Sequence, residues 1–133
     1  SGKDMWNLKL VKIGAKSITL TQLENDILRG YGDARIHFAI NCASFSCPIL
    51  LNEAFTANSV DTQLDTLTKR FVNDTKRNTI TPKAITISKI FKWFSKDFKK
   101  NQTLIDFLNT YAAITINRNA TINYMDYNWE LNN

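Results

Sequence analysis

The spacing of apolar residues changes several times along this 133-residue chain, from a helical period to strict alternation and back. Positions 60, 64, 67 and 71 are apolar, and steps of four, three and four place side chains on one face of a helix. Residues 84–87 instead alternate as a half-buried strand does. No glycine-rich phosphate loop follows a strand, and no segment repeats. Interleaved patterns of this kind predict an α+β fold, a single compact domain of helices and short β-hairpins.

Capping residues locate the ends of several predicted elements. Thr21 and Glu24 have the spacing of a capping box, so a helix should begin there and end at Gly30 or Gly32. Thr56 and Ser88 have hydroxyls suited to capping two later helices. The other expected elements are a hairpin of 9–13 with 17–20, a hairpin of 79–81 with 84–87, a helix over 104–111, and a strand at 121–124 after the apolar segment 114–116.

The segment 35–41 fits two structures. Ile36, Phe38 and Ile40 alternate with less apolar residues, which favours a strand. The same residues would also fit two turns of buried helix starting at Asp33. We favour the strand, followed by a loop over 42–48, because closely spaced Ser, Cys and Pro continue neither element.

Length and charge exclude some classes of protein. A chain of 133 residues is one domain by size, and no apolar run approaches the roughly 20 residues of a membrane span. The net charge is +5: residues 69–100 carry ten Lys/Arg and two Asp (+8), and the remainder carries seven basic and ten acidic residues (−3). Because aromatic residues are not clearly interleaved with these charges, we interpret this basic segment as a solvated helix face and expect no nucleic-acid binding.

The stretch 35–48 contains the only histidine, His37, and both cysteines, Cys42 and Cys47. Four residues separate the cysteines, a wider spacing than in the C-x-x-C motif of redox proteins and most zinc knuckles. Structural zinc sites usually pair two short Cys/His clusters on separate turns, and this chain has one cluster. We therefore expect no metal and no cofactor.

The two thiols allow several roles. One is nucleophilic catalysis with Cys47, the cysteine expected to be more exposed, or with Cys42, expected to be more buried. His37 would then be the base, and Asp126 or Asn128 could orient it. Otherwise the cysteines form a disulfide that closes a short loop, if the protein is exported, or are small buried apolar residues.

The sequence R-I-H-F-A-I-N-C-A-S-F-S-C-P at 35–48 resembles the signature of the DUF547 family, a family of unknown function. The resemblance continues through N-E-A-F-T-A at 52–57, through S-K-I-F-K-W-F-S-K-D-F at 88–98 and through Y-M-D-Y-N-W-E-L-N at 124–132. It covers nearly the whole chain and identifies relatives, while the biochemical role of the family is not established.

The resemblance carries expectations about the ends of the chain and its location. Members usually have a preceding helical segment with an F-W-I-N-x-Y-N motif, so residues 3–133 are expected to be an N-terminally truncated domain and Ser1-Gly2 a remnant of tag removal. Bacterial members often look exported. This implies an extracytoplasmic location, periplasmic or secreted, and favours a disulfide.

The order of elements is also similar to that of papain-like and transglutaminase-like thiol enzymes. The nucleophile of those enzymes would begin the missing helix, where the family motif has asparagine, so a non-catalytic domain fits better. We predict a binding or scaffold module for a protein, peptide, glycan or cell-envelope partner, with no oligomeric state predicted. The alternative is a thiol-dependent hydrolase or transferase. The expected site residues are His37, Cys42, Cys47 and Asp126 for catalysis, and Asn41, Ser44, Ser46, Glu53 and Trp129 for binding.

Overall fold

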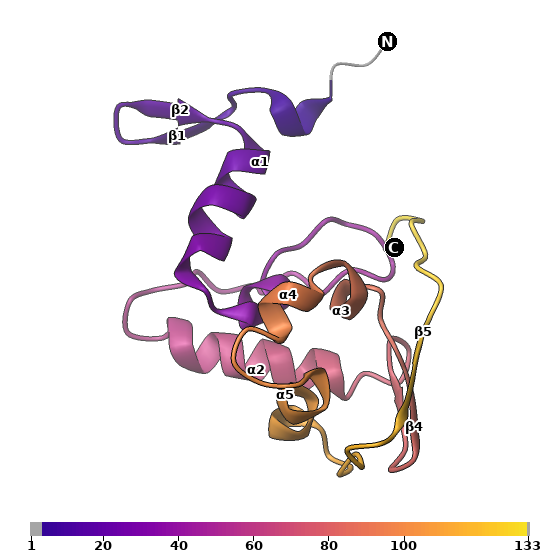
Figure 1. Cartoon of the computed structure of the whole chain (residues 1–133). Helices are drawn as coiled ribbons and strands as arrows, with labels where there is room; N and C mark the ends of the chain where they lie inside the picture. Colours follow the sequence, from indigo (N-terminus) through magenta and orange to yellow (C-terminus); the bar gives the residue numbers. More distant parts are fainter. Residues whose placement is uncertain (1–3, 133) are drawn as a thin grey trace. The chain divides into compact units, whose positions relative to one another are not determined.

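A computed structural model describes residues 4–132, and in it the chain divides into two units, residues 1–34 and residues 35–133 (Figure 1). Both units contain helices and strands, which confirms the predicted α+β class. The Ser1-Gly2 segment, interpreted above as a tag remnant, lies outside the described residues.

The first unit contains the predicted N-terminal hairpin. Strands β1 (Val11–Ile13) and β2 (Lys16–Ile18) pair antiparallel, with Ile13 opposite Lys16. The tight connection between them places Gly14 at φ 58°, a left-handed conformation that glycine adopts without steric cost. The hairpin is confirmed, with shorter strands than the alternation predicted.

A helical segment follows the hairpin, as predicted. It begins as α1 (Leu20–Gln22), continues as a π-helix over Leu23–Leu28 and closes with a 3₁₀ turn over Arg29–Tyr31. The segment ends at Gly32, whose φ of 72° is left-handed. Glycine is favoured there because a Cβ would be strained in this conformation, so the prediction of a glycine terminus is confirmed.

The capping box predicted for this helix is two residues too late. The Thr19 hydroxyl accepts a hydrogen bond from the Gln22 amide at 3.0 Å, and the Gln22 side chain accepts one from the Thr19 amide at 3.1 Å. The Thr21 hydroxyl instead donates to the carbonyl oxygen of Trp6 at 3.1 Å. Both Thr19 to Gln22 and Thr21 to Glu24 match the capping pattern, and the short hairpin connection selects the earlier one.

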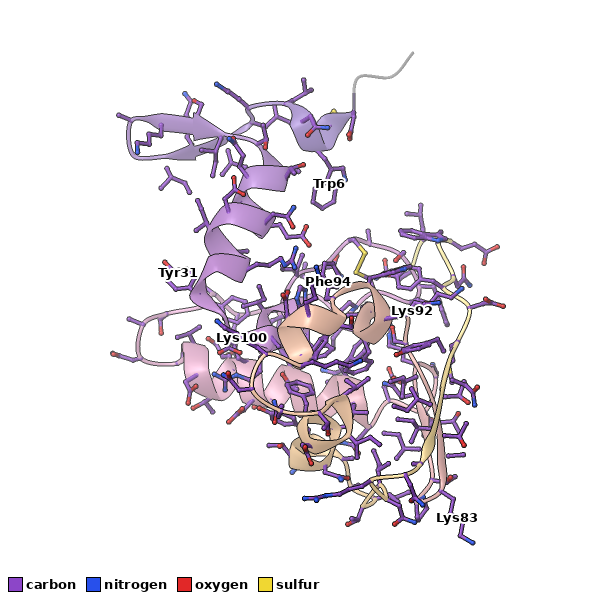
Figure 2. The ribbon with its side chains drawn as sticks, in the orientation of Figure 1. Trp6, Tyr31, Lys83, Lys92, Phe94 and Lys100 are labelled. Carbon is purple, nitrogen blue, oxygen red and sulfur yellow. A yellow bond between two sulfur atoms is a disulfide. The ribbon has the colours of Figure 1, made fainter. Side chains whose placement is uncertain are left out.

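None of the described residues of the first unit, 4–34, is buried. Trp6 is 43% exposed and Tyr31 is 79% exposed, and the Tyr31 side chain projects from the end of the helical segment (Figure 2). A unit of this size, residues 4–34, is too small to enclose a core of its own. This unit therefore derives its order from hydrogen bonds and caps rather than from a buried interior.

The strand predicted over 35–41 is wrong. Ala34–Phe38 forms a 3₁₀ helix, which is close to the alternative of a buried helix from Asp33. Ile36, His37 and Phe38 are all buried. Because this turn is enclosed on several sides, consecutive residues are buried and the apolar pattern carries no helical period. The predicted loop over 42–48 is confirmed.

The longest helix, α2 (Val60–Val72), carries the predicted stripe, and Leu64, Leu67 and Phe71 are buried. It starts later than Thr56, whose carbonyl oxygen accepts from the amides of Ser59 and Val60. The helix expected after Ser88 is divided at Phe94 into α3 (Ile90–Trp93) and α4 (Ser95–Phe98), and α5 (Leu104–Tyr111) is confirmed. None of the helices formed by the described residues has the length and apolar character needed to cross a bilayer.

A three-stranded sheet completes the second unit, in the order β3 (Thr79–Ile80), β4 (Ala84–Ile87), β5 (Thr121–Tyr124). β3 and β4 form the predicted antiparallel hairpin, and Lys83 lies at its tip (Figure 2). β4 and β5 are parallel, with Ile85 opposite Ile122, and the helices α3 to α5 make the crossover that parallel strands require.

The core of the second unit is a cluster of phenylalanine rings. Phe38 is fully buried, and its ring centroid lies 4.8 Å from that of Phe71 and 5.6 Å from that of Phe91. Phe98 lies 5.0 Å from Phe91 and 4.9 Å from Phe107. The cluster joins the 3₁₀ helix to α2, α3, α4 and α5, and α5 lies beside α2 (Figure 1).

Candidate functional site

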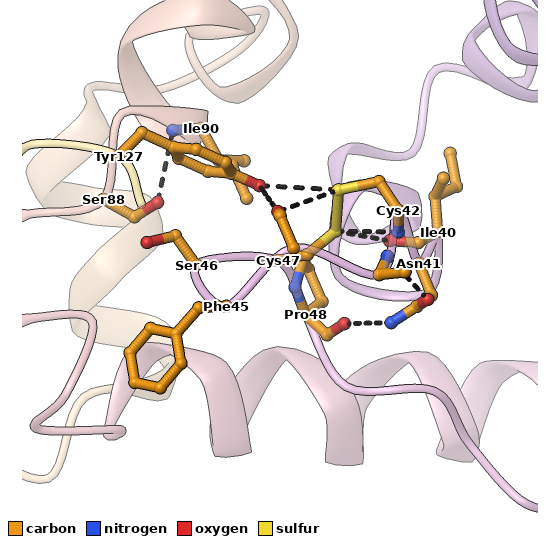
Figure 3. Close-up of a disulfide and its surroundings, with 12 residues drawn as sticks. Ile40, Asn41, Cys42, Phe45, Ser46, Cys47, Pro48, Ser88, Ile90 and Tyr127 are labelled. Atoms are coloured by element: carbon orange, nitrogen blue, oxygen red, sulfur yellow. Dashed lines mark hydrogen bonds between the residues drawn. A yellow bond between two sulfur atoms is a disulfide. The ribbon is translucent and has the colours of Figure 1, made fainter. Parts of the chain in front are cut away.

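The two cysteines form a disulfide (Figure 3). Of the roles considered for them from the sequence, closure of a short loop is the one confirmed. Their Cα atoms are 6.0 Å apart, and the Cys42 amide donates to the Cys47 sulfur at 2.9 Å. Asn41 braces the same loop, because its side-chain amide donates to the Pro48 carbonyl at 2.8 Å and its oxygen accepts from the Ala43 amide at 3.0 Å. The disulfide loop, residues 41–48, is therefore fixed at both ends.

The exposure of the two cysteines is the reverse of the prediction. Cys47 is only 3% exposed and Cys42 is exposed. Proline follows Cys47, and the chain turns into the interior there, since Pro48 is also buried. No described cysteine is free, and a disulfide sulfur is not the thiolate that nucleophilic catalysis requires.

The C-terminal tail runs along the disulfide loop. The Phe45 amide donates to the Glu130 carbonyl at 2.7 Å, and the Ser46 amide donates to the Asn128 carbonyl at 3.2 Å. The Asn128 amide donates in return to the Ser46 hydroxyl at 2.9 Å. These bonds join segments more than 80 residues apart, and they hold the tail without a regular strand.

Tyr127 contacts the disulfide loop through its hydroxyl. That oxygen lies 3.0 Å from the hydroxyl oxygen of Ser44. It also lies 3.5 Å from the sulfur of Cys42, and Figure 3 shows Tyr127 pointing toward the disulfide. Ser44 is 4% exposed, so this contact satisfies a buried hydroxyl. The tyrosine ring is thereby oriented by the loop at one end.

The ring of Tyr127, which is partly buried, belongs to a group that we call the aromatic surface: Trp93, Tyr127 and Trp129. The Tyr127 centroid lies 4.8 Å from that of Trp93 and 4.5 Å from that of Trp129. The two tryptophans lie 5.8 Å apart and are stacked at 28°. Trp93 is 47% exposed and Trp129 is 69% exposed. Trp129 was among the predicted binding residues, and Trp93 was not.

Charged groups flank the aromatic surface. The Lys89 ammonium donates to the Asp126 carboxylate at 2.8 Å, and this bond lowers the pKa of Asp126 below its usual value. Asp126 was expected to orient His37, yet its side chain is fully exposed and its partner is the lysine. The structure thus pairs Asp126, a residue of the tail, with Lys89 at the surface.

His37 is buried in a different environment. Its Nε2 lies 2.8 Å from a carboxylate oxygen of Asp97, on α4, and its ring stacks on Phe94 with centroids 3.9 Å apart. Asp97 is the carboxylate that sequence reasoning missed. Asp97 is the one acidic residue of the family motif at 88–98, so the sequence did contain this candidate. Its contact with His37 becomes visible only when α4 is placed against the 3₁₀ helix.

Arg77 stabilises the disulfide loop by hydrogen bonds to its backbone. Its guanidinium donates to the Cys47 carbonyl through Nε at 3.2 Å and Nη2 at 3.0 Å, and to the Phe45 carbonyl at 2.9 Å. It also forms an ion pair with Asp74. Sequence reasoning did not single out this arginine, whose planar fork binds two carbonyls of one loop.

Glu53 lies exposed in the segment before α2. Within residues 4–132, no three His, Cys, Asp or Glu side chains are grouped closely enough to hold a metal ion.

The comparisons with known proteins return one family. The model of the family described as "Protein of unknown function, DUF547" matches residues 2–72, which include the disulfide loop and all of α2. No curated protein and no solved structure matches the chain. Because the family model covers more than half of the 133 residues, the chain belongs to the DUF547 family.

Proposed function

We propose that this DUF547 domain is a non-catalytic binding module that works outside the cytoplasm and binds a glycan on the aromatic surface. The observation that carries the proposal is the exposure of Trp93 and Trp129, 47% and 69%, although both rings are large and apolar. Rings that are exposed together usually mark a contact surface, because burying them against a ligand is favourable.

A sugar ring suits these side chains. The face of an aromatic ring is electronegative, and the C–H bonds on one face of a pyranose are weakly positive, so the two stack. Polar groups for the sugar hydroxyls lie alongside on the same tail, where Asp126, Asn128 and Glu130 are exposed. A glycan therefore finds both stacking and hydrogen-bonding groups on one segment of chain.

The disulfide loop supports binding by holding the aromatic surface in place. Tyr127 is fixed by Ser44 and Cys42, and the neighbouring backbone is held by Phe45 and Ser46. Side chains that are ordered before binding lose less conformational entropy when the ligand arrives. A disulfide is also typical of proteins in oxidising compartments, which supports an extracytoplasmic location, periplasmic or secreted.

The groups considered for thiol catalysis support a non-catalytic role. Cys42 and Cys47 are joined, and His37 is buried, with Asp97 at hydrogen-bond distance and Phe94 stacked on its ring. The alternative, a thiol-dependent hydrolase or transferase, requires a reduced cysteine with a base within reach of it.

Isothermal titration of the full chain with soluble oligosaccharides, N-acetylglucosamine tetramer and cellotetraose, tests the proposal. Trp129→Ala and Trp93→Ala should each weaken binding about tenfold or more, since truncation of a tryptophan at a contact hot spot costs about 2 kcal/mol or more. Trp6→Ala is the matched control, because Trp6 is similarly exposed but lies in the first unit. Binding that survives both substitutions, or binding of peptides in place of every oligosaccharide, would contradict the glycan proposal.

A further inference from the structure

A separate feature of the second unit is an open cavity of about 530 Å³, a volume within the range of small-molecule sites. It lies where the connection after α4 enters α5, and β5 closes its other side. Its lining includes Lys99, Leu104 and Ile105 from the helical side, and Arg118 and Ile122 from the strand side. None of these residues belongs to the aromatic surface or to the disulfide loop.

The wall of the cavity is largely apolar. Leu104 and Ile105 are 2% and 6% exposed, so their side chains are anchored in the core at the base of the cavity. Ile122, on β5, is partly exposed there. A ligand that covers this wall with its own apolar part removes the remaining surface from water.

Two positively charged side chains, those of Lys99 and Arg118, line the same cavity. Lys99 and Arg118 are exposed, and within residues 4–132 neither side chain forms an ion pair or a hydrogen bond. The one carboxylate in the lining, Asp106, accepts from the Thr103 hydroxyl at 2.7 Å and from the Thr103 amide at 3.2 Å. These bonds hold the pKa of Asp106 below its usual value, with a smaller contribution from Arg118.

In the first turn of α5, the amides of Thr103 and Asp106 are used by its own capping box. The charge of the lining comes from its side chains, two positive and one negative, so that the cavity as a whole is positive. An unpaired guanidinium prefers the planar, bidentate oxygens of a carboxylate or phosphate.

We propose that this cavity binds a small amphipathic anion, a carboxylate or phosphate attached to an apolar chain. The anionic head lies between Lys99 and Arg118, and the chain lies against Ile122 and the small exposed part of Leu104 and Ile105. This site is independent of glycan binding, since it shares no residue with the aromatic surface.

Nuclear magnetic resonance of the full chain, labelled with ¹⁵N, tests the site directly. Octyl phosphate, kept below its micelle concentration, should shift the amide signals of 102–106 and 122 in a saturable manner. Inorganic phosphate should bind more weakly because it lacks the chain, and octyl glucoside should bind more weakly because it lacks the charge. Equal binding of octyl glucoside, or shifts spread over the whole chain, would overturn the proposal.

Charge reversal gives the second part of the test. Lys99→Glu and Arg118→Glu should each weaken octyl phosphate about tenfold or more, because each removes a charge-assisted bond. Lys76→Glu is the matched control, since Lys76 is exposed and lies outside the lining. Unchanged affinity in both cavity variants would refute the site. Flotation with vesicles of anionic phosphatidylglycerol distinguishes a membrane source, because vesicle binding without binding of soluble octyl phosphate would replace the proposed ligand by a lipid surface.

Discussion

The hydroxyl oxygen of Tyr127 lies 3.0 Å from the hydroxyl oxygen of Ser44, across a separation of 83 residues. Through this contact a buried serine of the family signature fixes a ring of the exposed aromatic surface. The disulfide loop and the C-terminal tail therefore stabilise each other, and a substitution that breaks this contact should lower the stability of both.

Tyr127→Phe tests that connection. The substitution keeps the ring between Trp93 and Trp129 but leaves the buried Ser44 hydroxyl without this partner. We expect the free energy of unfolding to fall by about 1–2 kcal/mol, as for other buried groups that lose a hydrogen bond. Chemical denaturation measures the difference.

Tyr124→Phe is the control, because the Tyr124 hydroxyl makes no hydrogen bond with another residue in the described part of the chain. Equal losses in the two variants would show that the contact with Ser44 contributes nothing.

Reduction of the disulfide should destabilise the second unit. Cys42 and Cys47 are five positions apart, and closing so short a loop reduces the entropy of the unfolded chain by an amount equivalent to about 2 kcal/mol. We expect a reductant to lower the midpoint of denaturation of the native chain and to leave the Cys42→Ala/Cys47→Ala variant unchanged. Intact mass after alkylation should show two labelled thiols only in the reduced sample. A native chain that is labelled without reductant would support the thiol enzyme instead.

Arg77→Lys should weaken the support of the disulfide loop while keeping the charge. A lysine ammonium can still approach Asp74, but it cannot donate simultaneously to the carbonyls of Cys47 and Phe45 in the geometry of the guanidinium. We expect a loss of about 1–2 kcal/mol in the free energy of unfolding. Arg70→Lys is the control, since Arg70 is exposed on the neighbouring helix, and a loss of equal size there would contradict the role of the fork.

Elements with a clear local period could be predicted from the sequence. The apolar stripe of α2 and the hairpin of β3 and β4 could be predicted from residues that are close together in the sequence, and the structure contains both. The turn at Ala34–Phe38 could not be predicted in the same way, because Ile36, His37 and Phe38 are buried in succession and so leave no apolar period in the sequence.

The site was predictable in some of its residues and not in its contacts. Family resemblance identified Ser44 and Trp129, but the pairing of the loop with the tail depends on the parallel placement of β5 beside β4. That pairing is made across a three-helix crossover, so no local pattern specifies it. The contact of His37 with Asp97 is likewise not specified by a local pattern, because 60 positions separate the two residues in the sequence.

Glu24 gives a prediction for the pH dependence of the first unit. Partial burial raises the pKa of its carboxyl above the usual 4.5, because it removes water from the carboxylate, and the attraction of Arg29 offsets part of this rise. The folded chain therefore binds this proton more tightly than the unfolded chain, and stability falls as the pH rises from 4.5 through the folded pKa. The cost is fully present at neutral pH, so Glu24→Gln should raise the stability there and make little difference near pH 3.

The measurement uses Trp6 fluorescence in a Trp93→Phe/Trp129→Phe background, in which the only remaining tryptophan reports on the first unit. Glu53→Gln is the control, because it removes an equal charge from an exposed position of the second unit. A lower stability of Glu24→Gln at neutral pH would contradict this prediction. It would mean that the attraction of the carboxylate to Arg29 outweighs the cost of removing the carboxylate from water.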